Sequence, residues 1–239
     1  MRLAVWSGPR NISTALMRSW ENRPDTVVVD EPLYAAFLAR TGIDHPGRDE
    51  VVAAGETNLD QAVAGLFAPL PPGIDVQYQK HMCHHLPDGP VPAWATGLTT
   101  VLLVRDPREV VASYVRSRAS VEPADIGLLQ QERLLDSLLA AGQDPPVVDA
   151  GDFLRNPEGY LRWWCDWLGL AFTDAMLHWL AGPRPSDGVW APYWYAAVLA
   201  STGFAPWRPR TVDLSPHDEA VAETCQEAYR RLWGRRVRL

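Results

Sequence analysis

The sequence predicts an α/β fold of three layers, in which helices cover both faces of a central parallel sheet of about five strands. Two observations indicate this class. Short apolar or β-branched segments alternate along the chain with segments of helical period, and strands joined by helices pair in parallel. In addition, 47% of the 239 residues are apolar, which is enough to build a substantial core.

The beginning of the chain predicts strands and helices in alternation. Residues 2–6 form a short apolar run that ends at a Ser-Gly pair, and residues 26–29 are β-branched, so both are predicted strands. Residues 13–22 carry an apolar stripe of helical spacing. Residues 32–40 open on a proline, which suits the first turn of a helix. Residues 75–82 alternate in character and predict a third strand.

The middle of the chain continues the pattern. Residues 42–56 are polar and rich in glycine, and we expect a loop there. Residues 59–67 and 126–141 have helical periodicity. The run TTVLLV at residues 99–104 is the clearest strand of the sequence, and residues 147–150 predict a fifth strand.

Three further helices complete the prediction. The helix expected at residues 107–118 starts like a capping box, with Asp106 as the N-cap, a proline in the first position and a glutamate in the third. Residues 157–168 place apolar side chains on one face, and residues 218–233 are amphipathic. Between these two segments, residues 181–210 are rich in proline and glycine and predict a loop.

Charge and composition exclude several classes of protein. The net charge is −7 and the isoelectric point is near 5.3, whereas a nucleic-acid-binding protein usually carries a basic excess. The three cysteines are far apart and predict reduced thiols. No signal peptide is visible, and no apolar run approaches the roughly 18 residues that span a bilayer. We therefore expect a single cytoplasmic domain over residues 1–239, with no nucleic-acid or membrane partner; the oligomeric state is not readable.

Charged and polar residues follow four of the predicted strands. They are the segment SGPRNIST at residues 7–14, Asp30-Glu31, Lys80-His81, and the segment RDPR at residues 105–108. Because the carboxyl ends of parallel strands meet at one edge of the sheet, we expect these groups to form a site there.

The segment SGPRNIST has the composition of an anion-binding loop. Gly8 permits an unusual backbone angle, the N–H groups of the following helix attract an anion, and Arg10 adds a positive charge. A nucleotide-hydrolysing loop has Gly, Lys and Ser or Thr where this chain has Ser13, Thr14 and Ala15. A magnesium nucleotide would therefore lack its usual ligands, which favours sulfuryl over phosphoryl transfer.

Arg105 and Ser113 predict a second phosphate site. Arg105 follows a strand, and Ser113 lies eight residues later, about two turns into the next helix. A guanidinium beside a helical hydroxyl is a good clamp for a phosphate group.

The two segments together resemble the PAPS-dependent sulfotransferases. PRNIST is similar to the PKSGTT loop of that family, and RDPREVVAS is similar to its second segment; GDFLRNPEGYLRWWCDWLGL resembles a later stretch. The segments SGPRN-STA-M, DEP-Y, KHM--H and DG-WAPYWY resemble a bacterial group of the superfamily, some of whose sequences carry aminotransferase-like names. Nothing in this sequence supports a pyridoxal-phosphate enzyme.

The resemblance implies a P-loop-like sulfotransferase fold and a site for PAPS, with PAP as product and a small-molecule hydroxyl or amine as acceptor. Arg105 and Ser113 would bind the 3′-phosphate, while Arg10 would stabilise the leaving oxygen. The loop that would grip the phosphosulfate consists of Gly8, Pro9, Arg10, Asn11, Ile12, Ser13 and Thr14. Ile12 departs from the family, which has glycine there, and Ala15 replaces a frequent aromatic residue.

Lys80 resembles the lysine that touches the phosphosulfate in the family. Two residues compete for the role of catalytic base. Glu31, in its Glu-Pro-Leu context, resembles members that use glutamate, whereas His81 matches the family's histidine only with an offset of one residue. Strand alternation places His81 opposite Lys80, so we favour Glu31. His84 and His85 are further candidates. The HxxHH pattern shows neither the further ligand nor the geometry that a zinc site needs, and no metal is predicted.

The late loop, residues 183–210, is predicted to be a lid or acceptor wall. Trp190, Tyr193, Trp194 and Tyr195 offer flat apolar surfaces with polar ends and are its predicted substrate-binding residues. Two other functions stay open on the sequence. One is a P-loop-type kinase, and the other is a non-catalytic protein that binds PAP or a nucleotide.

Overall fold

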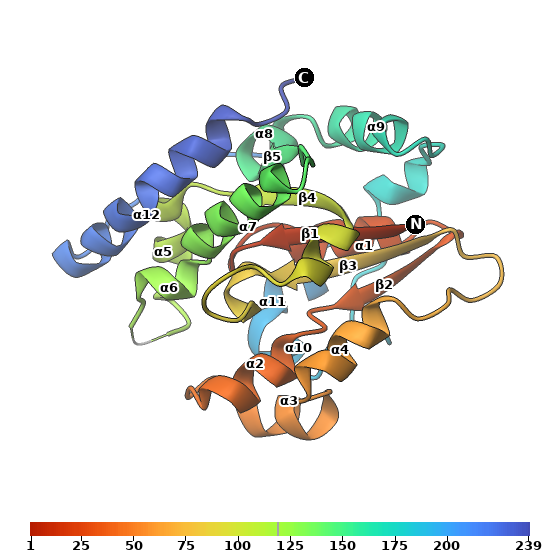
Figure 1. The fold of residues 1–239 in the computed structure, drawn as a ribbon. Coiled ribbons are helices and arrows are strands. Elements are labelled where there is room, and N and C mark those ends of the chain that lie inside the picture. The colour runs from red at the N-terminus through yellow and green to blue at the C-terminus, as the bar shows by residue number, and fades with distance from the viewer. Residues whose placement is uncertain (119) are drawn as a thin grey trace. The chain divides into compact units, whose positions relative to one another are not determined.

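The computed structural model describes residues 1–118 and 120–239, and its five strands form one sheet in the order β2-β3-β1-β4-β5 (Figure 1). β2 pairs in parallel with β3, and β4 pairs in parallel with β5. The predicted α/β class with a parallel five-stranded sheet is thus confirmed. The strands are β1 (Arg2–Ser7), β2 (Thr26–Asp30), β3 (Val76–Met82), β4 (Thr99–Val104) and β5 (Val147–Asp149).

The chain divides into two compact units, each built from several segments. Strand β1 begins in the first unit and ends in the second. The single domain expected over residues 1–239 stays a prediction. The first unit contains Met1–Ala4, Ser13–His81 and Pro157–Ala205, and the second contains Val5–Ile12, Met82–Asn156 and Pro206–Leu239.

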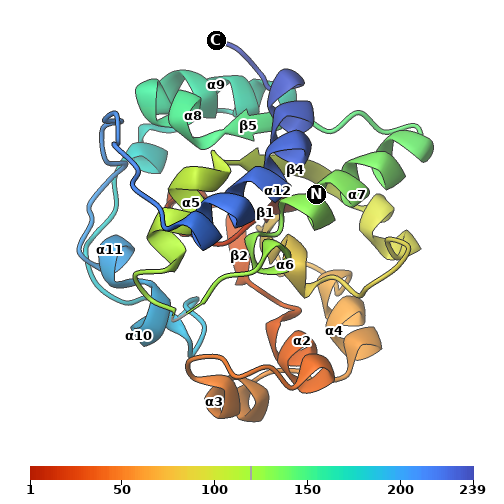
Figure 2. The same cartoon turned by 90° about the vertical axis from the view of Figure 1, so that its left-hand side faces the viewer.

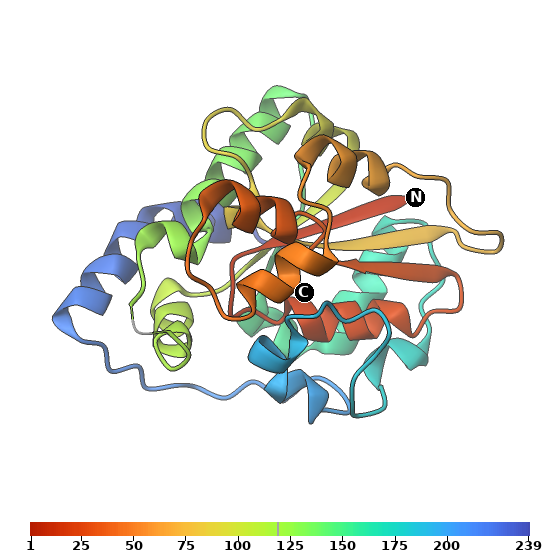
Figure 3. The same ribbon diagram turned by 90° about the horizontal axis from the view of Figure 1, so that it is seen from below.

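An aromatic core organises the first unit. Trp20 stacks on Tyr78 of β3, and it meets Trp164 edge-on, with 5.7 Å between ring centroids in both pairs. Helices α2 and α3 lie side by side (Figure 3). The helices of this unit are α1 (Ser13–Glu21), α2 (Tyr34–Thr41), α3 (Arg48–Ala54), α4 (Leu59–Leu66), α9 (Pro157–Trp167), α10 (Ala191–Trp194) and α11 (Ala196–Leu199), with a 3-10 turn at Asp174–Leu177.

In the second unit the long C-terminal helix α12 packs against α5 and α7 (Figure 2). The predicted cap of α5 is confirmed, because the Asp106 carboxylate accepts hydrogen bonds from the N–H groups of Arg108 and Glu109. The helices of this unit are α5 (Pro107–Tyr114), α6 (Pro123–Ile126), α7 (Leu128–Ala140), α8 (Ala150–Arg155) and α12 (Pro216–Gly234), with 3-10 turns at Cys83–His85 and Ala93–Gly97.

The predicted loop at residues 42–56 is wrong, because α3 occupies half of it. The helix is short, and Val51 is its one buried side chain. It is held by packing on α2: a Cβ at Gly55 would lie only 2.6 Å from the Cβ of Ala35, so glycine permits the close approach. Tertiary contacts of this kind leave little trace in periodicity.

Two other predictions need correction. Ala150 was predicted to end the fifth strand but begins α8, because the Asp149 carboxylate caps a helix by accepting from the N–H of Asp152 at 3.0 Å. The predicted loop at 181–210 contains the two short helices α10 and α11. In the described part of the chain, no helix has the length and apolarity needed to cross a membrane.

Candidate active site

The loop that follows β1 turns tightly within the second unit. A Cβ added to Gly8 would lie 2.1 Å from the carbonyl oxygen of Ile126, so only glycine fits without a backbone shift. Arg10 has a φ of +55°, in the left-handed region that side chains rarely adopt. The strained residue is therefore Arg10, and not Ile12, where the resembled family has its glycine. Strain at a loop after a strand is typical of ligand-binding sites.

Three of the predicted phosphate-binding residues lie together in this unit. The Nε of Arg10 donates to the Ser113 hydroxyl at 3.0 Å, and Nη1 of Arg105 donates to the Arg10 carbonyl at 2.6 Å. Arg105 also pairs with Glu109, in the first turn of α5, at 2.7 Å. The strand-end arginine thus supports the backbone of the loop, while Arg10 reaches the helix hydroxyl.

Positive charge is concentrated at these residues, which we call the arginine cluster: Arg10, Arg105 and Arg116. Burial lowers the pKa of Arg10, and the nearby charges of Arg105 and Arg116 lower it further. Among the described residues, neither Arg10 nor Arg116 has a carboxylate partner in an ion pair. Glu109 is thus the one carboxylate of the described chain that pairs with this cluster of three arginines, and an excess of positive charge favours binding of an anion. The sequence did not predict a role for Arg116, which follows the predicted phosphate clamp of Arg105 and Ser113.

The other loop residues either form hydrogen bonds that hold the loop or begin the next helix. The Asn11 side chain donates to the Leu103 carbonyl at 3.2 Å and accepts from the N–H of Ile12 at 2.8 Å. Ser13 and Thr14 are the first two residues of α1 and belong to the first unit. Ser13 is buried, and Thr14 is half-buried.

In the first unit, strand register brings a lysine and two carboxylates together. Asp30 of β2 is the register partner of Lys80 of β3. The Lys80 Nζ donates to Asp30 at 2.9 Å, to Glu31 at 2.5 Å and to the Tyr195 hydroxyl at 2.6 Å. An ammonium group has three donors, so all of them are used. Lys80 is the only lysine in the sequence, and its side chain is 1% exposed. We call these four residues the lysine cluster.

Tyr195 belongs to this buried network. Its hydroxyl accepts from the Trp190 indole N–H at 3.0 Å and donates to the Asp30 carboxylate at 2.6 Å. Asp30 also accepts from the N–H of Gly188 at 3.2 Å. Asp30 is therefore the centre of the cluster, although the sequence singled out only its neighbour Glu31.

Glu31 combines an unusual backbone with a buried carboxylate. Its φ is +42°, and its N–H donates to the Lys80 carbonyl at 2.9 Å, so the residue leaves β2 by a sharp turn. Burial raises the pKa of the Glu31 carboxyl, the charge of Asp30 adds to this, and Lys80 opposes it. A carboxylate whose pKa is raised toward neutrality is a better proton acceptor than an ordinary glutamate.

His81 lies on the opposite side of β3 from Lys80. Its Nε2 is 3.1 Å from the side-chain oxygen of Gln79, two residues earlier and therefore on the same face of the strand. Burial lowers the pKa of His81 to about 3 from an ordinary 6.5. This imidazole has little affinity for a proton, which favours Glu31 as the base. His84 and His85 belong to the second unit, with ring centroids 4.5 Å apart. Within the described residues, no group of three or more potential ligands is arranged for a metal ion.

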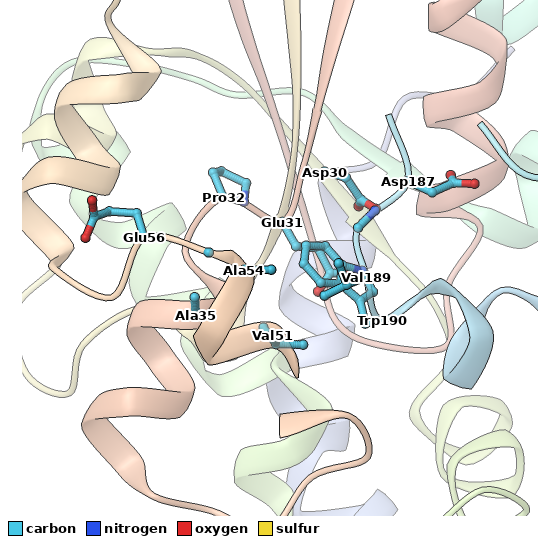
Figure 4. Close-up of a pocket in the computed structure, with 12 residues that line it drawn as sticks. Asp30, Glu31, Pro32, Ala35, Val51, Ala54, Glu56, Asp187, Val189 and Trp190 are labelled. Atoms are coloured by element: carbon cyan, nitrogen blue, oxygen red, sulfur yellow. The ribbon is translucent and has the colours of Figure 1, made fainter. Parts of the chain in front are cut away.

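The four aromatic residues of the late loop take different positions. Trp190 lines a cavity of about 300 Å³ beside Glu31 (Figure 4). Tyr193 is exposed and donates to Glu50 at 2.7 Å, and Trp194 stacks on the His45 ring with 5.0 Å between centroids. Tyr195 is buried in the lysine cluster. Of the four predicted acceptor-wall residues, Trp190 alone is among those that line this cavity.

Comparisons with known proteins agree with the geometry. A family model described as a sulfotransferase domain matches residues 1–224. Among solved structures, a sulfotransferase from Alicyclobacillus acidocaldarius has a TM-score of 0.55 at 14% identity, covering 97% of this chain and 94% of its own. The sulfotransferase domain of the Synechococcus PCC 7002 olefin synthase has a TM-score of 0.52 at 18% identity, covering 94% of each chain. These structures share the α/β fold.

Two curated relatives come from Arabidopsis thaliana. They are named branched-chain-amino-acid aminotransferase-like proteins 1 and 2 and are 39% and 35% identical over 218 and 231 residues. The alignments cover 89% and 94% of this chain but 38% and 40% of the relatives, so the chain spans about two-fifths of their length.

The fold and the family model agree on one class of domain. The chain belongs to the family described by the sulfotransferase domain model. The resemblance seen in the sequence is thereby confirmed at the level of the family.

Proposed function

We propose that this protein transfers a sulfuryl group from PAPS to a hydroxyl or amine of a small-molecule acceptor and releases PAP. Family membership supports sulfuryl transfer. The observation that carries the choice of donor is the arginine cluster, in which half-buried Arg10 contacts Ser113 and has no carboxylate partner among the described residues. Such a cluster fits a phosphate-bearing anion. PAPS supplies the sulfuryl group when it is bound.

The arginine cluster and the loop after β1 are assigned to the donor. Arg105 and Ser113 would hold the 3′-phosphate, and Arg116 would add to its attraction. Arg10 would stabilise the negative charge that develops on the leaving phosphate. The loop assigned to the phosphosulfate consists of Gly8, Pro9, Arg10, Asn11, Ile12, Ser13 and Thr14.

Glu31 is assigned as the base. Its carboxylate would take the proton of the acceptor hydroxyl while the acceptor oxygen forms a bond to sulfur, and the bond between sulfur and the bridging oxygen breaks. Because Asp30, Glu31 and Tyr195 occupy all three donors of Lys80, we assign this lysine to the positioning of Glu31 rather than to the donor. His81 is too weakly basic for the same role.

The names of the plant relatives raise a different activity, aminotransfer. Pyridoxal-phosphate enzymes hold their cofactor as a Schiff base on a lysine. The only lysine of this sequence is Lys80, which is buried and has all its donors in use. This observation favours sulfuryl transfer over aminotransfer for this chain.

Calorimetry with PAP and ATP tests the donor. We expect PAP to bind without magnesium. The variant Arg10→Ala should bind PAP at least tenfold more weakly, because it loses the free energy of about one charge-assisted hydrogen bond. Tight ATP binding that needs magnesium would instead indicate a kinase. PAP binding without transfer of sulfate from PAPS to any acceptor would indicate a non-catalytic binding protein.

A further inference from the structure

Tyr195 enters the lysine cluster from a distant part of the chain. It lies 115 residues after Lys80, directly behind α10, and is 4% exposed. A phenol hydroxyl has one donor and two acceptor positions. The Tyr195 hydroxyl donates to Asp30 at 2.6 Å. It accepts from Lys80 at 2.6 Å and from the Trp190 indole N–H at 3.0 Å. All three positions are therefore used, and the hydroxyl has a fixed place in the cluster.

The ammonium group of Lys80 depends on Tyr195 for its position. Lys80 donates to Glu31 at 2.5 Å, and its two other hydrogen bonds go to Asp30 and Tyr195. Its Nζ also lies 4.8 Å from the centroid of the Tyr195 ring, within the range of a cation–π contact. Loss of the Tyr195 hydroxyl would leave a buried ammonium donor unpaired, which is costly, and would free the group to shift relative to Glu31.

Trp190 connects this network to the cavity beside Glu31. It is one of the residues that line the cavity, and its indole N–H is the group that donates to Tyr195 (Figure 4). Its ring meets Tyr34 of α2 edge-on, with 5.1 Å between centroids. Both rings belong to one buried apolar cluster with Val51 of α3. A molecule in the cavity would therefore contact the same side chain that holds the Tyr195 hydroxyl.

From these contacts we infer that Tyr195 is a positioning residue for the catalytic base: it holds Lys80 against Glu31, and Trp190 holds Tyr195 in place from the cavity wall. This inference rests on the proposed function, in which Glu31 takes the proton of the acceptor. Tyr195 does not belong to the lining of the cavity, so it acts through its neighbours and not by touching the acceptor. This role replaces that of acceptor-wall residue, which the sequence predicted for Tyr195.

The electrostatics around Glu31 give this role a measurable sign. Burial raises the pKa of the Glu31 carboxyl, whereas Lys80 and the Tyr195 hydroxyl act to lower it. Tyr195→Phe keeps the ring and removes the hydroxyl, so the pKa of Glu31 should rise. The ionisable groups around Glu31 are Asp30, Lys80 and Tyr195 in the lysine cluster, and Glu56 and Asp187 in the lining of the cavity.

NMR titration of labelled glutamate carboxyls measures the pKa of Glu31 without an acceptor, and Glu31→Gln assigns the signal. We expect a higher pKa in Tyr195→Phe than in wild type. Tyr229→Phe is the matched control, because this buried tyrosine donates to Asp149 at 3.1 Å in the second unit, outside the lysine cluster. It should leave the pKa of Glu31 unchanged. An unchanged pKa in Tyr195→Phe, or an equal change in both variants, would overturn the inference.

Transfer of labelled sulfate from PAPS to para-propylphenol adds a kinetic measurement. Tyr195→Phe should lower kcat about tenfold at about pH 7, as expected for the loss of one hydrogen bond to a charged group, with little change in the KM for the acceptor. The loss should shrink as the pH rises, because more of the Glu31 carboxyl is then ionised. A loss that is the same at every pH would indicate a merely structural role and contradict the inference.

Trp190→Phe tests the link between the network and the cavity. The change removes the indole N–H and part of the cavity wall, so kcat should fall while the KM for para-propylphenol rises. A rise in KM with an unchanged kcat would show that Trp190 does not support Tyr195, and would overturn that part of the inference.

Failure of the inference and failure of the proposed function give different results. If sulfate is transferred from PAPS and Tyr195→Phe behaves like Tyr229→Phe, the positioning role is wrong and sulfuryl transfer stands. If Tyr195→Phe raises the pKa of Glu31 but no sulfate is transferred from PAPS to any acceptor, the effect of Tyr195 on Glu31 stands and the proposed function is wrong.

Discussion

Replacement of Lys80 by methionine isolates the energetics of the lysine cluster. The wild-type ammonium contacts Asp30 at 2.9 Å, Glu31 at 2.5 Å and Tyr195 at 2.6 Å, and it is 1% exposed. Lys80→Met leaves two buried carboxylates with no cation. Removing one partner of a buried ion pair typically costs about 3–5 kcal/mol, and we expect that loss of unfolding free energy near pH 7.

The pH dependence of this loss identifies its cause. Burial raises the pKa of the Glu31 carboxyl, and in the Lys80→Met variant this carboxyl would hold a proton in the folded state that the unfolded chain releases. The pKa of this carboxyl in the folded state is then raised further. The free energy of unfolding of the variant is therefore highest at low pH and falls by about 1.4 kcal/mol per pH unit as the pH rises. The difference from wild type should therefore shrink by about 2 kcal/mol between about pH 7 and about pH 5.5.

Urea unfolding at both pH values measures this difference. The double variant Lys80→Met with Asp30→Asn removes one of the two charges and should recover at least about 1.5 kcal/mol relative to additive single changes. A loss below about 1 kcal/mol that does not vary with pH would refute the account, because the lysine would then not be compensating buried charge.

Three further predictions follow from the same structure. Arg116→Ala should weaken PAP binding about threefold to tenfold and reduce its salt dependence in calorimetry, whereas an unchanged affinity would remove Arg116 from the donor site. Gly8→Ala should cost about 2 kcal/mol or more in urea unfolding, because its Cβ would meet the Ile126 carbonyl, and a wild-type curve would contradict the tight turn. Burial lowers the pKa of His81 from 6.5 to about 3, so as the pH falls His81 is protonated in the unfolded chain before it is protonated in the folded protein. The free energy of unfolding should therefore fall by about 2 kcal/mol from about pH 8 to about pH 5. His81→Gln should remove that dependence on pH, and an unaltered dependence would exclude His81 as its source.

The contacts within the site that we propose for the donor were partly predictable. Arg10 and Arg105 follow strand ends, and Ser113 lies eight residues after Arg105 on the next helix; the three contact one another in the second unit. Arg116 was missed, since an exposed arginine after a helix has no local pattern that separates it from a solvated charge.

The contacts of the first unit were harder to predict from the sequence. Glu31 and Lys80 were singled out from their strand-end positions, but the role of Asp30 depends on the register between β2 and β3, which one strand alone does not specify. Tyr195 looked like an acceptor-wall residue, yet it is buried against Asp30 and Lys80. A tyrosine has both an apolar ring and a polar end, so its sequence position fits either role. Helix α3, which helps to wall the cavity, was missed because packing on α2 holds it.

Transfer of labelled sulfate from PAPS by wild type and by Glu31→Gln tests the central claim most directly. The exchange of a carboxylate for an amide keeps size and removes the base. The account predicts that wild type transfers sulfate to a hydroxylated acceptor and that the variant does so about 100-fold to 10,000-fold more slowly, with unchanged affinity for PAP. Transfer by Glu31→Gln at the wild-type rate would contradict the account.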